Sequence, residues 1–253
     1  MKYVNLIVII LLILISNLLA GYKYVLSGNA DTQYNVWVEV DGVDTCFPQV
    51  NPGVDAIGYG TSPLAPFATM VYALGNSLIY DTIIVFNAGS DSYYINNGSY
   101  GNKNYSIYSN YATFYGRFDG YYGSIQGVRI GGDIGDKSFN IGYYVSGRSI
   151  PLYFNYNYVD VVASISNKVF GTGGNYVKTF VKNNFICLTN NSTSSYFLSL
   201  EGNANYTLEW SSNVILNKYK QNTTGFFSAP SNISIVKLND FRFYRNIIIN
   251  VCF

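Results

Sequence analysis

The sequence predicts an all-β fold in which the chain winds as a solenoid, and three observations support this prediction. From Asp81 to the C-terminus, short runs of β-branched and aromatic residues are separated by Gly, Asn, Asp and Ser, with no helical pattern between them. Aromatic residues make up 17% of the chain and hydrophobic residues 49%, so the chain can form strands and bury a sizeable core. Three of the apolar runs also begin alike, with an Asn directly before an apolar triplet.

The strand-forming runs are short, and several are continuously apolar instead of alternating, as is typical of strands whose two faces are both covered. The clearest runs are residues 82–86, 159–162, 185–188, 214–216 and 247–249.

The repeated Asn residues are Asn184, Asn213 and Asn246, which lie about 30 residues apart, within the roughly 20–45 residues of one solenoid repeat. In a parallel solenoid, an Asn at the edge of each strand can stack on its counterpart in the next coil, and the side-chain amides then hydrogen-bond along the stack. We therefore expect an asparagine ladder through these three residues.

Helical periodicity occurs in one segment after the N-terminal region. Phe67, Met70, Val71 and Leu74 recur at the spacing of one helix face, and Pro66 suits the first turn of the helix. The open end of a solenoid exposes unpaired strand edges and apolar core residues. We therefore expect a short capping helix here, with these four apolar residues facing the first coil.

Three segments near the N-terminus follow one another in a recognisable order: V-W-V-E-V-D-G at 36–42, G-T-S-P-L-A-P-F-A-T-M at 60–70 with Y-A-L at 72–74, and D-T-I-I-V at 81–85. This order resembles the opening of right-handed parallel β-helix proteins of the pectate-lyase-like superfamily. The departures are a longer insertion at 46–59 and Ile79-Tyr80 before the aspartate. The resemblance implies a single right-handed parallel β-helix whose end is covered by the short helix.

The N-terminus resembles an export signal, because one Lys precedes the largely apolar residues 4–20. A cleaved secretory signal, with a cut after Ala30, and an uncleaved membrane anchor both fit this segment. We therefore expect residues 1–30 to be a signal peptide or membrane anchor and residues 31–253 to be the β-helix domain, with the first strand and cap at 31–80 and the coils at 81–253. Both alternatives place the domain outside the cytoplasm, secreted or anchored at a cell or virion surface.

Export agrees with the Asn-x-Ser/Thr sequons, all of which follow the apolar segment, although a chain rich in Asn, Ser and Thr also generates sequons by chance. The candidate glycosylation sites are Asn97, Asn104, Asn190, Asn191, Asn205, Asn222 and Asn232. The three cysteines, Cys46, Cys187 and Cys252, show neither a metal-ligand spacing nor a disulfide framework, so buried thiols are expected.

Charge and composition exclude several functions. The formal net charge is +1, so the basic field typical of nucleic-acid-binding proteins is missing. The chain contains no His, which excludes a Ser-His-Asp triad and a His-ligated metal. We expect no metal and no cofactor, except Ca²⁺ if the protein is an enzyme. The His-free, Tyr- and Asn-rich composition resembles that of surface proteins of acidophilic archaea and their viruses.

An enzymatic site would have to use carboxylates, and the best candidates are Asp119, Asp133 and Asp136 together with Arg129. Asp133 and Asp136 could bind a hard cation or act as acid and base. Polyuronate-cleaving enzymes of that superfamily place two to four Asp on one face, often with Ca²⁺ or a catalytic Arg or Lys, but the paired-Asp and Gly-His-Gly motifs of the superfamily's hydrolases are absent from this sequence. The Gly-rich setting fits equally well a turn with solvated charges.

Tyrosine is the other candidate, since phenol rings stack well on sugar rings, although Tyr is also a good strand former without any function. The candidate glycan-binding residues are Tyr93, Tyr94, Tyr108, Tyr115, Tyr121 and Tyr122. We expect an exported adhesion or structural protein that binds glycans or neighbouring copies, with a polysaccharide lyase or glycoside hydrolase as the alternative. A third possibility is a filament or coat subunit that assembles through its C-terminal edge near Phe253.

Overall fold

A computed structural model describes most of the chain after residue 20. The residues described are 21–78, 81–96, 105–117, 119–120, 123–133, 139–143, 152–163, 168–173, 176–190, 196–201, 205–217, 225–228 and 237–249.

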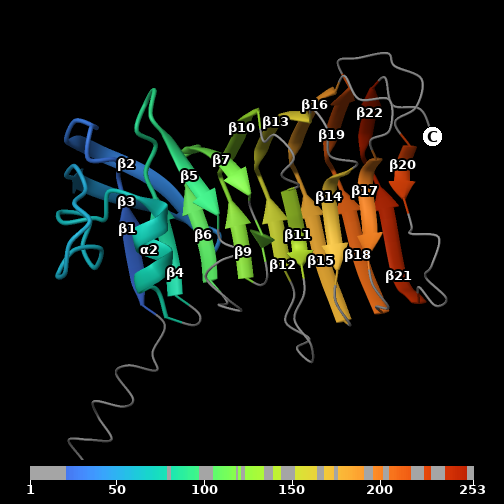
Figure 1. Cartoon of the computed structure of the whole chain (residues 1–253), viewed down its shortest axis with the longest axis horizontal. Coiled ribbons are helices and arrows are strands. Elements are labelled where there is room, and N and C mark those ends of the chain that lie inside the picture. The colour runs from blue at the N-terminus through green and yellow to red at the C-terminus, as the bar shows by residue number, and fades with distance from the viewer. Residues whose placement is uncertain are drawn as a thin grey trace, which may run out of the picture.

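Most described residues lie in strands, and all of these strands except the hairpin at residues 33–50 form three parallel sheets (Figure 1). The first sheet contains, in spatial order, β1 (Tyr22–Val25), β4 (Asp81–Val85), β6 (Tyr105–Ser109), β9 (Gly123–Gln126), β12 (Leu152–Asn155), β15 (Tyr176–Lys182), β18 (Asn205–Ser211) and β21 (Lys237–Tyr244). The second sheet contains β5 (Ser92–Asn96), β7 (Thr113–Arg117), β10 (Arg129–Asp133), β13 (Tyr158–Ala163), β16 (Phe185–Asn190), β19 (Val214–Asn217) and β22 (Ile247–Ile249). The third sheet contains β8 (Asp119–Gly120), β11 (Phe139–Tyr143), β14 (Lys168–Gly173), β17 (Tyr196–Glu201) and β20 (Gly225–Ser228).

The chain visits these sheets in a fixed rotation. From β6 to β20 each strand of the first sheet is followed by one of the second and then one of the third, before the chain returns to the first sheet at β21. Strands that follow one another in a sheet pair in parallel, as in the full register between β15 and β18. This arrangement confirms the expected all-β, solenoid-like fold, and the five predicted strand runs fall in strands, except that Phe86 lies just beyond the end of β4.

The described core residues of the sheets belong to the first and second sheets, where alternate side chains point inward. Val159, Ile186, Ile215 and Ile248 occupy equivalent register positions on four neighbouring strands of the second sheet. They pack in one cluster with inward residues of the first sheet, such as Trp210. Apolar residues at the same position of successive coils therefore build a continuous core.

The expected asparagine ladder is present and is one residue longer than predicted. The side-chain oxygens of Asn184, Asn213 and Asn246 each accept a hydrogen bond from the backbone N–H of the preceding ladder residue, at 2.8–3.0 Å. The additional member is Asn157, which the sequence pattern missed because the triplet that follows it, Tyr158-Val159-Asp160, is not apolar throughout. Asn157, Asn184 and Asn213 are almost fully buried, so the ladder satisfies polar groups inside the protein.

The capping helix α2 spans Met70–Asn76 and begins later than expected. Thr69 is its N-cap, and the Thr69 hydroxyl accepts a hydrogen bond from the backbone N–H of Tyr72 at 3.2 Å. The prediction that Pro66 begins the helix was wrong. Phe67 instead forms an extended bridge to β1, with its N–H donating to the carbonyl of Tyr24 at 2.9 Å.

The helix faces the core as expected, with one exception. Met70 and Leu74 are buried in the core cluster, as is Phe67 before the helix. Val71 was expected beside them but is 39% exposed, and Ala73 occupies the core position instead. Because the helix begins only at Met70, its buried face is formed by Met70, Ala73 and Leu74.

A hairpin of β2 (Gln33–Val40) and β3 (Val43–Val50) covers the outer face of the first sheet at its N-terminal end. Its two-residue turn is Asp41-Gly42, and both residues have positive φ, as in a type I′ turn. Apolar residues of the hairpin pack with Ile84, Phe86 and Tyr108 of the sheet. The first strands of the solenoid are therefore buried on both faces.

The domain boundary expected between residues 30 and 31 lies inside the fold. β1 pairs in parallel with β4, and Val25 and Leu26 are fully buried. A cut after Ala30 would therefore remove the first strand of the first sheet. Residues 1–20 lie outside the described part of the chain, and in the described part no helix is long and apolar enough to cross a membrane.

Candidate functional site

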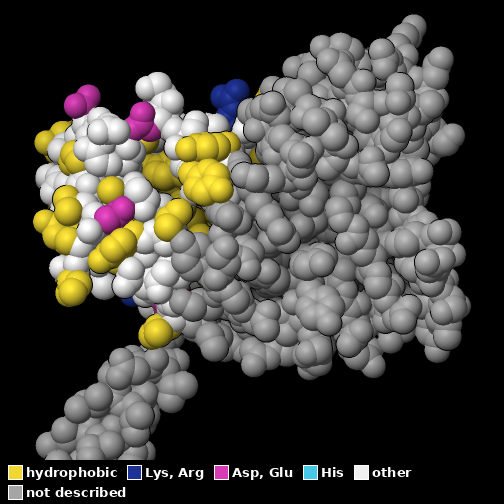
Figure 2. Space-filling model, viewed as in Figure 1, with side chains coloured by type: hydrophobic (Ala, Val, Ile, Leu, Met, Phe, Trp, Pro, Cys, Tyr) yellow, Lys and Arg dark blue, Asp and Glu magenta, His cyan; other side chains and the backbone are white. Residues whose placement is uncertain are grey.

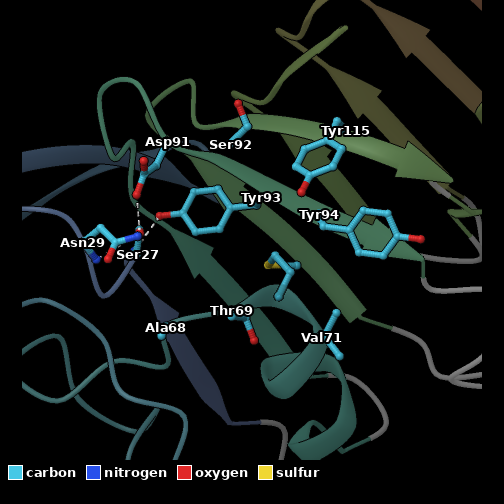
Figure 3. Close-up of a pocket in the computed structure, with 11 residues that line it drawn as sticks. Ser27, Asn29, Ala68, Thr69, Val71, Asp91, Ser92, Tyr93, Tyr94 and Tyr115 are labelled. Atoms are coloured by element: carbon cyan, nitrogen blue, oxygen red, sulfur yellow. Dashed lines mark hydrogen bonds between the residues drawn. The ribbon is translucent and has the colours of Figure 1, made fainter. Parts of the chain in front are cut away.

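A pocket of about 550 Å³ lies where α2 meets the beginning of the second sheet (Figure 3). Its size is that of small-molecule sites in proteins. Three parts of the chain contribute to it: the loop after β1, the start of α2, and strands β5 and β7 with the loop that precedes β5. The described residues that line it are Ser27, Asn29, Ala68, Thr69, Met70, Val71, Asp91, Ser92, Tyr93, Tyr94 and Tyr115.

The aromatic side of the pocket consists of Tyr94 and Tyr115. They occupy paired positions on β5 and β7, and their ring centroids lie 5.3 Å apart with an interplanar angle of 56°. Tyr94 is 36% exposed and Tyr115 is 42% exposed, so both rings are accessible to a ligand. The neighbouring pair, Tyr93 and Phe114, points inward because side chains alternate along a strand.

Tyr93 belongs to the base of the pocket, where its hydroxyl is fully engaged. The hydroxyl donates to the carbonyl of Phe86 at 2.7 Å and accepts from the backbone N–H of Ser27 at 3.0 Å. Burial raises the pKa of Tyr93 well above its usual range, and the charge of Asp91 raises it further. The phenol is therefore a fixed, protonated donor that joins the loop after β1 to β5.

Asp91 and Ser27 lie on the opposite side of the pocket from Tyr94 (Figure 3). The Ser27 hydroxyl donates to Asp91 Oδ2 at 2.6 Å and accepts from the backbone N–H of Asn29 at 3.2 Å. These bonds hold the carboxylate of Asp91 against the loop. The pocket thus combines aromatic rings on one side with a carboxylate on the other.

The helix side of the pocket is held by Asp55. Its carboxylate accepts hydrogen bonds from the backbone N–H groups of Ala68 and Thr69 and from the Thr69 hydroxyl, at 2.6–3.0 Å. A carboxylate that binds the first N–H groups before a helix fixes the helix start and complements its dipole. The position of Val71 at the pocket wall follows from this anchor.

The surface around the pocket is largely apolar and poor in basic side chains. Figure 2 shows hydrophobic side chains over the end of the molecule that holds α2, with some Asp or Glu side chains and few Lys or Arg side chains between them. Val71, Tyr94 and Tyr115 are all partly exposed there. Partly exposed rings beside apolar and uncharged groups are typical of surfaces that bind sugars or proteins.

The structure separates the tyrosines that the sequence grouped together. Tyr94 and Tyr115 line the pocket, and Tyr93 forms its base with only 4% of its surface exposed. The expectation for Tyr108 was wrong, because Tyr108 is buried under the hairpin and its hydroxyl donates to Asp41. Burial and this hydrogen bond raise the pKa of Tyr108 to about 12. Tyr121 and Tyr122 lie outside the described residues.

None of the candidate catalytic residues is among the described residues that line this pocket. Asp119 lies in β8 of the third sheet, whereas Asp133 lies in β10 of the second sheet, so the two backbones belong to different faces of the solenoid. Arg129 is exposed on β10, with its guanidinium 5.1 Å from the centroid of the Tyr158 ring. Asp136 lies outside the described residues, and the described part holds no group of three or more Cys, Asp or Glu able to bind a metal.

Two of the predicted glycosylation sites fall at strand ends: Asn190 ends β16 and Asn205 begins β18. The other candidates, Asn97, Asn104, Asn191, Asn222 and Asn232, lie outside the described residues. Cys187 is buried, as expected, and Cys46 is partly buried in β3; Cys252 is outside the described residues.

Sequence reasoning missed the polar half of the pocket, namely Ser27, Asp91 and Thr69. The Ser27–Asp91 hydrogen bond joins positions 64 residues apart, and no local motif marks such a pair. No family model matches the chain, and neither a curated protein nor a solved structure matches it significantly.

Proposed function

We propose that the protein is an exported, non-enzymatic carbohydrate-binding protein that presents the pocket beside α2 to a glycan. The observation that carries this proposal is the pair of adjacent, accessible rings of Tyr94 and Tyr115 at the edge of a pocket with polar groups opposite. Aromatic rings provide a flat apolar face for the C–H face of a sugar at a small cost in side-chain entropy. Hydroxyl and carboxylate groups then select among sugars.

A non-enzymatic role fits the acid and base groups of the pocket. Asp91 is the single carboxylate among its described lining residues, whereas glycoside hydrolysis uses a pair of carboxylates about 5–9.5 Å apart. Tyr93 stays protonated because its pKa is raised. The pocket is therefore suited to binding and poorly suited to a hydrolysis that needs two carboxylates.

The proposal also includes the finer form of the fold, a closed right-handed parallel β-helix. The fixed rotation of the chain through three sheets and the ladder of Asn residues at one corner support this form. Connections between parallel strands of a sheet are right-handed in about 98% of cases. An experimental structure showing the third sheet packed on the core of the other two tests it.

The experiment that tests the function is a binding measurement with a panel of soluble neutral and charged oligosaccharides, using calorimetry. The variants are Tyr94→Ala and Tyr115→Ala, with Tyr34→Ala as a matched control. Tyr34 is a 67% exposed Tyr on β2 and does not line the pocket. We expect each pocket variant to weaken binding about tenfold or more, because the stacking surface is lost, while the control binds like the wild type.

Two results would overturn the proposal. One is equal binding by the pocket variants and the wild type, which would remove the pocket as the glycan site. The other is turnover of a bound oligosaccharide that depends on Asp133 or Asp119, which would support the alternative of a polysaccharide lyase or glycoside hydrolase.

A further inference from the structure

The charge of the pocket restricts the sugars that fit it. Asp91 carries the only formal charge among the described lining residues, and Lys and Arg are absent from that set. A carboxylate in the pocket repels carboxylate and sulfate groups of a ligand and attracts ammonium groups. The pocket therefore favours cationic groups over anionic groups, although the formal net charge of the whole chain is only +1.

Three of the hydroxyls that line the pocket already donate a hydrogen bond inside the protein. The Ser27 hydroxyl already donates to Asp91 Oδ2, and the Thr69 hydroxyl already donates to Asp55 Oδ2, both at 2.6 Å. The Tyr93 hydroxyl is engaged with the carbonyl of Phe86. These three hydroxyls are thus unable to donate to a ligand without losing an internal hydrogen bond.

Asp91 retains capacity as an acceptor. Ser27 binds Oδ2, and a carboxylate has two oxygens with about four lone-pair directions between them. A sugar hydroxyl or ammonium group donates to such an oxygen, and the resulting charge-assisted hydrogen bond is about twice as strong as a neutral one. A sugar carboxylate has no proton to donate and adds a like charge.

We infer that the pocket binds a neutral or amino sugar through Asp91 and excludes acidic sugars. The ring of the sugar lies against Tyr94 and Tyr115, and its hydroxyl or ammonium group donates to the carboxylate. This inference rests on the proposed carbohydrate binding and specifies the ligand class of the same site. Asp91 is a specificity-determining residue, whereas the two tyrosines supply most of the affinity.

The test uses three oligosaccharide series with the same linkage and length, built from glucose, glucosamine and glucuronic acid, at a mildly acidic pH at which the amines are protonated. For the wild type we expect the glucosamine series to bind at least as tightly as the glucose series. We expect the glucuronic acid series to bind about tenfold more weakly than glucose, which corresponds to about 1.4 kcal/mol.

The diagnostic variant is Asp91→Asn, which keeps the size of the side chain and its ability to accept from Ser27. It should reduce the preference for glucosamine over glucose and allow glucuronic acid to bind about as well as glucose. Asp44→Asn is the matched control, because Asp44 is an exposed Asp on β3 away from the pocket, and it should leave the ranking unchanged.

The outcomes separate the two proposals. If glucuronic acid binds as tightly as glucose to the wild type, or if Asp91→Asn leaves the ranking unchanged while Tyr94→Ala still weakens binding, the charge selection is wrong and the carbohydrate site stands. If none of the three series binds, or if binding is indifferent to Tyr94→Ala and Tyr115→Ala, both proposals are overturned.

Discussion

The side-chain amide of Asn184 donates a hydrogen bond to Oδ1 of Asn213 at 2.9 Å, and it donates a second one to the carbonyl of Phe154, also at 2.9 Å. Both side chains are almost fully buried. The ladder thus joins three successive coils through groups that water does not reach. An Asn in the middle of the ladder forms hydrogen bonds with the coils on both sides, so its loss affects more than one coil.

We expect Asn213→Ala to lower the free energy of unfolding by about 2–4 kcal/mol, because it leaves buried donors and acceptors without partners and opens a cavity. Asn76→Ala is the control, since Asn76 is exposed at the end of α2 and its replacement should cost no more than about 0.5 kcal/mol. Urea unfolding at equilibrium measures both. Equal stability of the two variants would contradict a structural role for the ladder.

Three of the four ladder members were predictable because they share a local pattern, an Asn before an apolar triplet, that recurs at the length of one coil. The stacked strands of the second sheet were predictable for the same reason. Successive coils repeat the same arrangement of residues, so a local sequence pattern is enough to predict it.

The pocket was predictable only in part. Alternation along β5 places Tyr93 and Ile95 on one face and Tyr94 on the other, so the sequence contained the signal that separates the two tyrosines. The position of Asp91 opposite the rings depends on how the loop after β1 packs on β5. That packing is a long-range property, and neither periodicity nor spacing reports it.

A second prediction concerns two glycines that both have a positive φ. Gly127 has φ of 65° and Gly42 has φ of 80°, so both occupy the left-handed region in which an added Cβ is strained. They differ in space: a Cβ at Gly127 would lie 2.1 Å from the carbonyl oxygen of Ser109, whereas a Cβ at Gly42 meets nothing within 4 Å.

We therefore expect Gly42→Ala to cost about 1 kcal/mol of unfolding free energy and Gly127→Ala to cost at least about 2 kcal/mol more, since the backbone of the neighbouring coil must shift. The difference in unfolding free energy between the two variants, measured by thermal unfolding at one pH, separates the cost of the steric clash from the cost of the strained backbone conformation. If both variants were destabilised equally, the close approach of the two coils at Gly127 would be in doubt.

A third prediction concerns acid. Glu209 is only 8% exposed, on the outer face of the first sheet, and its Oε1 lies 2.7 Å from Lys182 Nζ and accepts from the Tyr244 hydroxyl at 2.7 Å. The hydrogen bond from Lys182, followed by that from Tyr244, lowers the pKa of Glu209 below 4.5. A carboxylate whose pKa is lower in the folded state stabilises the fold above its unfolded pKa, and this stabilisation is lost as the pH falls through the folded-state pKa.

The wild type should therefore lose stability as the pH falls below about 4.5, and Glu209→Gln should remove part of that dependence. At neutral pH we expect Glu209→Gln to cost about 1–3 kcal/mol, because Lys182 loses a charged partner. Glu39→Gln, at an exposed position of β2, is the control and should leave the pH profile as in the wild type. Identical pH profiles for the wild type and Glu209→Gln would show that this cluster does not contribute to acid unfolding.

The last prediction concerns residues 21–30, which sequence reasoning had assigned to the leader. The backbone N–H of Gly21 donates to Asp81 Oδ1 at 2.7 Å, and Lys23 lies 3.9 Å from the same carboxylate group. Asp81 is only 1% exposed. Removing these partners leaves a buried carboxylate with less compensation, and it also uncovers the edge of β4 and the apolar residues that Val25 and Leu26 cover.

We therefore expect a protein that begins at Asp31 to be several kcal/mol less stable than one that begins at Gly21, and to bind hydrophobic dyes that report exposed core. The comparison of urea unfolding midpoints for the two proteins measures the effect. Ser27 also leaves with this segment, so glycan binding at the pocket should fall with stability. Equal midpoints would show that β1 is dispensable and would restore the boundary after Ala30.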